Sequence, residues 1–293
     1  MSATVGVLGV GRMGAGICAA LARAGHEVLA FDVRPGRAEQ ARAAGARWGE
    51  SAPAVAGAAE VLVSSLPGSP ELRDAMEAVM GELRGGATWI DTTSSTPAVA
   101  GPLVAAASAR RVDCLDAPVG GGPEQAAAGA LRLYVGGPPA TVERRREVLE
   151  ALGTVEHMGA AGAGYTTKLL VNLLWFGQAV ATGEAMLLAA RSGIDLELLR
   201  ATLGRSAAAS DFVGRDAGNI LNGDYMASFG LDRCCEELDA VVSLAGELGV
   251  PFELSSEVAR AYTRALERYG AVDGELLAVA LLEERGGVPL RRA

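Results

Sequence analysis

Short runs of apolar and β-branched residues alternate with longer helical patterns through the first half of the chain. Parallel strands need a crossover connection, so this alternation predicts a mostly parallel sheet with helices on both of its faces. The expected strands lie at residues 4–8, 27–31, 61–66, 88–91, 112–115, 131–135 and 154–157.

The pattern changes after residue 162, where a long helix is predicted to run to about residue 191. Gly193 is placed to end this helix with a left-handed cap, and Asp195 is placed to cap the next helix. Only helical periodicity follows. We therefore expect a doubly wound α/β domain at residues 1–162 and an all-α domain, joined to it through the long helix, at residues 163–293.

A glycine-rich turn follows the first expected strand. Gly9, Gly11 and Gly14 form G-x-G-x-x-G at the start of a helix, and the second strand ends at Asp32. Glycines permit the tight turn and a close backbone approach, and the helix N-terminus favours a pyrophosphate, so a Rossmann-type domain is expected. Asp32 is placed to accept hydrogen bonds from a ribose 2′-hydroxyl, which favours NAD, although Arg34 nearby keeps NADP open.

Two further turns follow later strands. Leu66 and Pro67 lie at the end of the third strand, and residues 91–94 lie at the end of the fourth. Ligands of open α/β sheets bind outside the carboxyl ends of the strands, so both turns are candidates to border the nicotinamide. Ordinary turn chemistry is the alternative for each of them.

The basic residues of the chain are 25 arginines and one lysine, Lys168. Arginine cannot replace lysine where a compact amine has to lose a proton, so the retention of this lysine points to chemistry. Asn172 follows one helical turn later and shares its face. A desolvated lysine can act as a general acid or base, and the asparagine can donate to the same oxygen. A second glycine-rich turn, at residues 116–122, is a candidate to face the same site.

Composition excludes several classes of function. The net charge of −9 disfavours a nucleic-acid partner. The four cysteines form no C-x-x-C pair and show no metal-ligand spacing, so a reduced, cytoplasmic, metal-free protein is expected. Apolar runs are interrupted before about 18 residues, which predicts no membrane span, and no signal peptide is evident.

Four segments together resemble the β-hydroxyacid dehydrogenase family, which includes 3-hydroxyisobutyrate dehydrogenase and tartronate semialdehyde reductase. They are GVLGVGRMG at 6–14, DTTSSTP at 91–97, DAPVGGG at 116–122 and GAGYTTKLLVN at 162–172. The resemblance implies that Lys168 is catalytic and that Asn172 is its polar partner. It also implies a homodimer or homotetramer with the long helix in the interface. The implied cofactor-binding residues are Gly9, Gly11, Arg12, Met13, Gly14, Asp32, Leu66, Pro67 and Ser94.

Two positions depart from the family pattern. Gly120 stands where the family's substrate motif has a serine. Glu236 stands where the family has a lysine in the C-terminal part of the chain. A hydroxyl and a cation that would hold a substrate carboxylate are therefore missing, although the backbone N–H groups of Gly120, Gly121 and Gly122 can still cradle an anion. The resemblance thus implies an altered substrate-anion site.

We therefore predict an NAD-dependent oxidoreductase that interconverts an alcohol and its carbonyl by hydride transfer and acts on a small molecule. An imine reductase or reductive aminase of similar fold is one alternative, because acidic residues at 236 and 237 suit a cationic iminium. A non-catalytic NAD(H)-binding module is the other.

Overall fold

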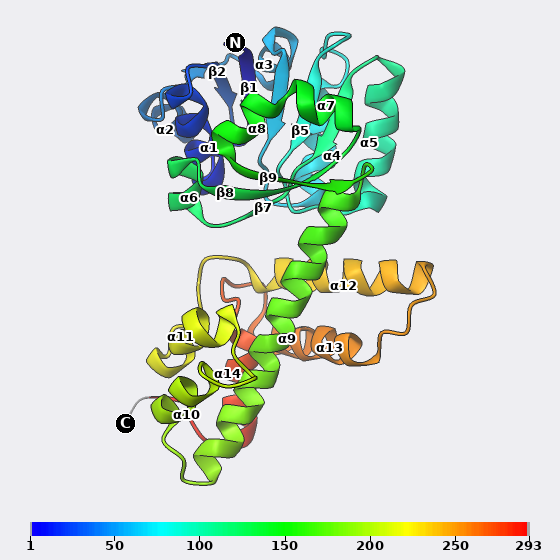
Figure 1. Cartoon of the computed structure of the whole chain (residues 1–293). Helices are drawn as coiled ribbons and strands as arrows, with labels where there is room; N and C mark the ends of the chain where they lie inside the picture. The colour runs from blue at the N-terminus through cyan, green and yellow to red at the C-terminus, as the bar shows by residue number, and fades with distance from the viewer. Residues whose placement is uncertain (1, 292–293) are drawn as a thin grey trace. The chain divides into compact units, whose positions relative to one another are not determined.

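A computed structural model describes residues 2–291. The chain folds into two compact units that divide between Lys168 and Leu169. Strands and helices build the first unit, and helices build the second (Figure 1). Helix α9 (Ala163–Arg191) contributes to both units, because the division falls within its second turn.

Within the described residues, the first unit is built on one nine-stranded sheet of order β3-β2-β1-β4-β5-β6-β8-β7, and β9 pairs with β8. Strands β1 to β6 pair in parallel, whereas β8 runs antiparallel to both β6 and β7. The strands are β1 (Thr4–Leu8), β2 (Glu27–Phe31), β3 (Arg47–Trp48), β4 (Val61–Ser64), β5 (Thr88–Asp91), β6 (Asp113–Asp116), β7 (Val119–Gly120), β8 (Leu131–Gly136) and β9 (Gly153–Gly159).

Both faces of the sheet are buried under helices. Val61 and Val63 of β4 pack into one apolar cluster, and Leu62 between them packs into the other. Successive side chains of a strand point to opposite faces, so this is the burial that a doubly wound sheet requires, and the predicted fold class is confirmed. The helices are α1 (Arg12–Arg23), η1 (Pro35–Arg37), α2 (Ala38–Ala43), α3 (Ala52–Ala58), α4 (Ser69–Val79), α5 (Pro97–Ala109), α6 (Pro123–Ala128), α7 (Pro139–Arg144) and α8 (Arg146–Leu152).

The carboxyl ends of neighbouring strands form a row across the sheet. Leu8 of β1 pairs with Ser64 of β4. Ser64 pairs with Asp91 of β5, and Asp91 pairs with Asp116 of β6. The segments that follow these residues therefore leave the sheet at one edge, which is the edge where open α/β folds bind ligands.

Some boundaries differ from the sequence prediction. β4 ends at Ser64 rather than at residue 66, because the chain turns away at the sheet edge. The strand predicted at 112–115 spans Asp113–Asp116. The sequence pattern does not predict β3 and β7, since two residues are too few to show a period of two.

The second unit packs its helices around two apolar clusters. Leu169, Leu173 and Phe176 of α9 lie in one cluster, and Ala179 and Met186 lie in the other. The remaining elements are α10 (Leu196–Leu203), the π-helix η2 (Phe212–Asp216), α11 (Ala217–Asn222), α12 (Leu231–Glu247), α13 (Glu253–Tyr269) and α14 (Leu277–Gly286).

Both predicted caps in this unit are confirmed. Gly193 has a φ of 72°, and the side chain of Asp195 accepts a hydrogen bond from the N–H of Leu198 at 2.7 Å. The sequence pattern did not predict η2 and α11, because each is too short to show a helical repeat.

Within residues 2–291, α9 is the one helix long and apolar enough to cross a membrane by length and composition. The apolar residues of this helix are interrupted, as the sequence predicts, but its mean hydropathy is still high enough to meet this criterion. Its interruptions include Asn172 and Gly177, which add no charge. A core helix of a soluble protein passes the same test, and α9 contributes side chains to both clusters of the second unit.

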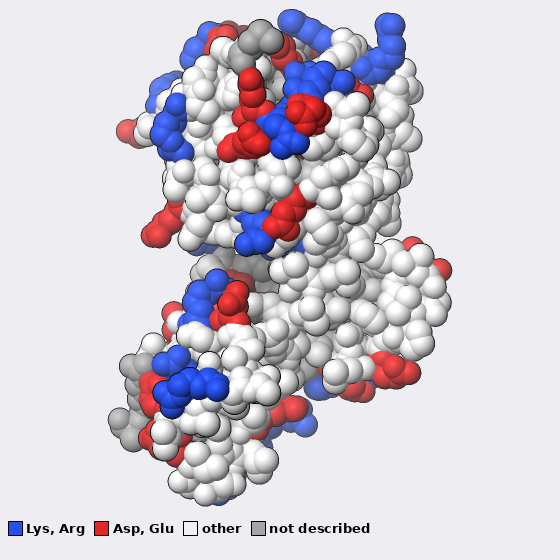
Figure 2. Space-filling view, viewed as in Figure 1, with Lys and Arg blue, Asp and Glu red and all other residues white. Residues whose placement is uncertain are grey.

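Charged side chains of both signs lie close together on the face shown in Figure 2, where acidic and basic residues are intermixed. Several form ion pairs, such as Arg132 with Glu156 at 2.6 Å and Arg146 with Glu143 at 2.7 Å.

Candidate active site

The three glycines of the turn after β1 have different roles. Gly9 has a φ of +91°, and a Cβ there would lie 2.2 Å from the carbonyl oxygen of Ser65. A Cβ on Gly14 would lie 1.9 Å from the carbonyl oxygen of Gly9, so α1 packs directly on the turn. A Cβ on Gly11 would meet no atom within 4 Å. Open space at the N-terminus of α1 fits the close approach of a dinucleotide pyrophosphate.

Asp32 follows β2 directly and is held beside the glycine turn. Its Oδ2 accepts a hydrogen bond from Val10 N–H, and its Oδ1 accepts one from Arg34 N–H, both at 2.8 Å. Each carboxylate oxygen can accept a second bond, so the side chain can still receive ribose hydroxyls. On the first turn of α1, Arg12 is exposed and Met13 is partly buried.

The turns after β4 and β5 are joined to each other. Leu66 N–H donates to Thr93 Oγ1 at 3.2 Å, next to Ser94. Leu66 and Ser94 are partly buried and Pro67 is exposed, so all three stay accessible at the sheet edge. The structure thus brings the three predicted nicotinamide contacts to one place.

Asp91, at the end of β5, is the centre of a buried hydrogen-bond network and is 1% exposed. Its Oδ1 accepts from Ser64 Oγ at 2.6 Å and from Thr93 N–H at 3.1 Å, and its Oδ2 accepts from the hydroxyl of Tyr165 at 2.6 Å. Burial raises the pKa of Asp91 to about 6, although these hydrogen bonds act to lower it. Asp91 therefore faces the start of α9 rather than solvent.

Asp116, at the end of β6, caps α9 from a distance. Its Oδ1 accepts from Gly162 N–H at 2.8 Å, and its Oδ2 accepts from Tyr165 N–H at 3.1 Å. These are two of the backbone donors that a helix N-terminus leaves unpaired, and a carboxylate there is also favoured by the helix dipole. The ends of two neighbouring strands therefore hold the first turn of α9.

Gly164 allows this close docking. A Cβ on Gly164 would lie 2.2 Å from the carbonyl oxygen of Tyr134 and 2.7 Å from that of Asp116. Gly162 has a φ of +91°, in the left-handed region that favours glycine. The glycine at 164 thus brings helix and strand backbones together, which is a packing role.

Lys168 lies one turn after Tyr165 on α9, and Asn172 lies one turn further along the same helix. Lys168 and Asn172 are both partly buried. The Nδ2 of Asn172 donates to Oε2 of Glu237 on α12 at 2.6 Å. The amide of Asn172 is therefore held by a carboxylate that is itself 9% exposed.

The acidic pair on α12 splits between two environments. Glu236 is exposed and pairs with Arg233 at 2.9 Å, whereas Glu237 is buried against Asn172. The sequence singled out Glu236 as the replacement for the family lysine. The carboxylate that contacts a predicted catalytic residue is its neighbour.

The glycine turn at 120–122 lies at the end of β7. Gly122 N–H donates to Oε1 of Gln125 at 3.0 Å, so one of the three backbone donors expected to cradle an anion is already used. Gly121 has a φ of +113°, a conformation that favours glycine.

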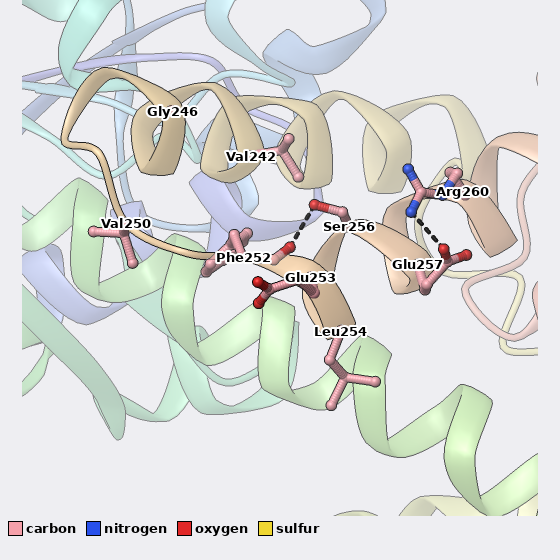
Figure 3. A pocket seen from close by; sticks show the side chains of 9 residues that line it. All are labelled: Val242, Gly246, Val250, Phe252, Glu253, Leu254, Ser256, Glu257 and Arg260. Carbon is pink, nitrogen blue, oxygen red and sulfur yellow. Dashed lines mark hydrogen bonds and ion pairs between the residues drawn. The ribbon is translucent and has the colours of Figure 1, made fainter.

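A separate hollow lies in the second unit, between α12 and α13 (Figure 3). Val242, Phe252 and Leu254 contribute to its lining, together with the ion pair of Arg260 and Glu257. It contains none of the residues predicted for the active site.

The sequence analysis missed Tyr165, named Glu237 only as an acidic residue suited to an iminium, and assigned Asp91 and Asp116 only to turns. A signal was present, because both aspartates end strands that pair with each other. Nothing in the sequence tells that their carboxylates point toward a helix that begins far along the chain.

Comparison with known proteins identifies the class. The NAD binding domain of 6-phosphogluconate dehydrogenase matches residues 4–162, and the NAD-binding domain of NADP-dependent 3-hydroxyisobutyrate dehydrogenase matches residues 162–282. A probable 3-hydroxyisobutyrate dehydrogenase of Mycobacterium bovis is 37% identical over 197 residues, which are 67% of each chain. The fold and the matches define an NAD(P)-dependent dehydrogenase that acts on hydroxyl groups. The chain belongs to the 3-hydroxyisobutyrate dehydrogenase family, as its four motifs predict.

Solved structures agree with this assignment. The Mycobacterium tuberculosis 3-hydroxyisobutyrate dehydrogenase with L-serine is 29% identical, with a TM-score of 0.87 over 96% of this chain and 99% of that one. An imine reductase from Pseudomonas sp. is 19% identical, with a TM-score of 0.64 over 96% of this chain and 99% of that one, which is a likeness of fold alone. The dehydrogenase prediction is therefore better supported than the imine reductase alternative.

Proposed function

We propose that the protein oxidises the alcohol of a small hydroxy acid to its carbonyl, and catalyses the reverse reduction, with Lys168 as the general acid and base. The main observation in support of this function is the position of the chain's single lysine. It stands one turn beyond Tyr165, on a helix whose start is held by Asp91 and Asp116 at the carboxyl edge of the sheet. The glycine turn with Gly11 leaves the sheet at the same edge.

The residues at this edge fit a dinucleotide. The backbone at Gly9, Gly11 and Gly14 and the N-terminus of α1, with Arg12 and Met13, would hold the pyrophosphate, and Asp32 would receive the ribose hydroxyls. Leu66, Pro67 and Ser94 would border the nicotinamide. NAD, when bound, supplies the acceptor or donor of the hydride. Asp32 favours NAD over NADP, since a carboxylate repels a 2′-phosphate.

Lys168 moves the proton of the reaction. In oxidation its neutral amine takes the proton from the substrate hydroxyl, and in reduction its ammonium returns a proton to the carbonyl oxygen. Asn172 would orient the same oxygen, and its contact with Glu237 fixes the amide. We assign cofactor binding to residues 1–162, and substrate binding and subunit contacts to residues 163–293.

The substrate would contact the turn at Gly120, Gly121 and Gly122. A small hydroxy acid is favoured by the similar proteins, one of which was solved with L-serine.

A homodimer or homotetramer is supported by apolar side chains that α9 exposes. Leu170, Leu174 and Leu188 are 44%, 64% and 71% exposed. A cytoplasmic location is supported by four cysteines that form no disulfide in the described residues, as a reducing compartment allows.

The test is NADH oxidation, followed at 340 nm, with a panel of aldehydes and ketones that pairs each acid with its neutral analogue. Lys168→Ala should lower kcat by about 10²- to 10⁴-fold, the usual contribution of a positioned acid or base, while NADH binding stays unchanged. Lys168→Arg should not restore turnover, because guanidinium does not release a proton. Near-wild-type turnover by Lys168→Ala would contradict the assignment.

Glu237 favours one second candidate. A buried carboxylate beside Asn172 suits a cationic iminium, which is the intermediate of an imine reductase. Assays with ketone alone and with ketone plus a small amine separate the two functions. Turnover that requires the amine supports the imine reductase, and tight NADH binding without turnover of any carbonyl supports a non-catalytic module.

A further inference from the structure

Tyr134 and Gly120 are neighbours across the antiparallel pair of β7 and β8. Val119 pairs with Leu133 and Gly120 with Arg132, which places Tyr134 diagonal to Gly120. A Cβ on Gly120 would lie 3.2 Å from the hydroxyl oxygen of Tyr134. The phenol group therefore lies beside the space that a side chain at position 120 would use.

The side chain of Tyr134 points away from the apolar core, and its hydroxyl oxygen is open to solvent. Leu133 and Val135 on either side pack into the apolar core, so alternation turns Tyr134 to the other face of β8. The residue is 9% exposed, and its hydroxyl forms no hydrogen bond within residues 2–291. A hydroxyl that is open to solvent and not used by the protein can donate a hydrogen bond to a ligand at the predicted substrate turn.

The surrounding turn is poor in other donors. Gly120 has no side chain, and Gly122 N–H is used by Gln125. Burial raises the pKa of Tyr134 above its ordinary value, so the phenol keeps its proton and remains a donor. Arg132, two residues away, is paired with Glu156 at 2.6 Å.

We propose that the hydroxyl of Tyr134 is the hydrogen-bond donor that holds the acid group of the substrate at the Gly120 turn. This rests on the proposed function and deepens it, because it makes a carboxylate-bearing alcohol the preferred substrate class. A carboxylate is a pure acceptor and pairs well with a neutral donor, whereas an ammonium group has no lone pair to offer the phenol proton. Gly120 and Tyr134 act as a pair, in which the strand neighbour supplies the hydroxyl that position 120 lacks.

The primary experiment compares a 3-hydroxy acid with its methyl ester in wild type and Tyr134→Phe. Losing one hydrogen bond to a charged group should raise KM for the acid about 10- to 100-fold, with kcat changed less than about threefold. The ester should change less than about threefold in both constants. Tyr262→Phe is the matched control: it removes a buried hydroxyl that donates to the carbonyl oxygen of Glu275 at 2.9 Å, so the preference for acid over ester should stay the same.

A rescue variant separates donation from packing. Gly120→Ser in the Tyr134→Phe background places a hydroxyl in the vacated space. The double variant should prefer the acid over the ester at least about tenfold more than Tyr134→Phe does. Gly120→Ser alone should not improve on wild type, because its Cβ would lie only 3.2 Å from the phenol oxygen. If the double variant does not regain the preference for the acid and Tyr134→Phe also has a lower free energy of unfolding, Tyr134 has a packing role. That result would overturn the proposal.

Binding without turnover distinguishes this proposal from the proposed function. The dissociation constant of the hydroxy acid is measured on NADH-loaded Lys168→Ala, with and without Tyr134→Phe. An increase of about 10- to 100-fold with Tyr134→Phe supports the proposal even if Lys168 has another role. An unchanged constant overturns it and leaves the role of Lys168 standing, and a wild type that binds no hydroxy acid overturns both.

Discussion

The hydroxyl of Tyr165 donates a 2.6 Å hydrogen bond to Asp91, a residue 74 positions earlier in the chain. The bond joins the end of a central strand to the first turn of α9, three residues before Lys168. Together with Asp116, which accepts from Gly162 and Tyr165, it fixes the start of the helix on the sheet. The position of the proposed catalytic lysine in the first unit therefore depends on two buried carboxylates.

Ionisation of Asp91 should reduce stability. Its ordinary pKa is 3.8 and burial raises it to about 6, so the folded state keeps a proton that the unfolded state releases. This contribution is fully present below about pH 4 and is lost as pH rises through about 6, by about 3 kcal/mol for a shift of about two units. The free energy of unfolding of wild type minus that of Asp91→Asn, from urea titrations, should fall over this window and stay flat above about pH 7. A difference that rises with pH would contradict this.

Removing the remote cap of α9 should destabilise the fold. Asp116→Ala leaves the N–H groups of Gly162 and Tyr165 without their acceptor, at a cost of about 2–4 kcal/mol. Asp116→Asn keeps one acceptor oxygen and should cost less. Asp195→Ala is the matched control, since this exposed cap satisfies only the N–H of Leu198 and should cost about 1 kcal/mol. Urea unfolding measures all three, and equal losses for the two alanine variants would disprove the special role of Asp116.

Alanine substitutions at Gly11 and Gly14 should affect different properties, NADH binding at Gly11 and thermal stability at Gly14. A Cβ on Gly11 meets no protein atom, so Gly11→Ala should keep the melting temperature of wild type but weaken NADH binding by about tenfold or more. A Cβ on Gly14 would overlap the carbonyl oxygen of Gly9, so Gly14→Ala should lower the melting temperature itself. Gly36→Ala, at an exposed and open position, is the control and should change neither quantity. Normal NADH affinity in Gly11→Ala would place the pyrophosphate elsewhere.

Asp32 should determine the choice of cofactor. Asp32→Ser removes the charge that repels a 2′-phosphate and should lower the preference for NADH over NADPH by about tenfold or more. Arg34→Ala should act in the opposite direction, because a nearby arginine can accommodate that phosphate. Dissociation constants for both cofactors test the pair, and an unchanged preference in Asp32→Ser would contradict the ribose assignment.

Glu237 and Glu236 offer a comparison between neighbours. Glu237→Gln weakens the hold on the amide of Asn172 and should lower kcat by about tenfold, with the KM for NADH unchanged. Glu236→Gln, on the exposed side of α12, should stay within about twofold of wild type. The reverse order of effects would show that Glu236 faces the substrate, as the family register alone suggests.

Local pattern was enough to predict the doubly wound sheet, the long helix at 163–191 and the cap at Asp195, because each depends on periodicity or on backbone chemistry within a few residues. It also predicts a cofactor turn, since the spacing of Gly9, Gly11 and Gly14 permits a close backbone approach. Composition and the family motifs together predict the chemistry of Lys168, and neither depends on its contacts in the fold.

Tertiary structure decided which side chains meet. Asp91 and Asp116 read as turn residues in the sequence, and only the register of β5 with β6 aims both carboxylates at the start of α9. Only the folded structure shows that Glu237, and not Glu236, contacts Asn172. Only the folded structure shows that Tyr134 lies beside Gly120. Side-chain direction on a strand or helix is fixed by the neighbours packed against it, so contacts between distant residues arise only when the chain is folded.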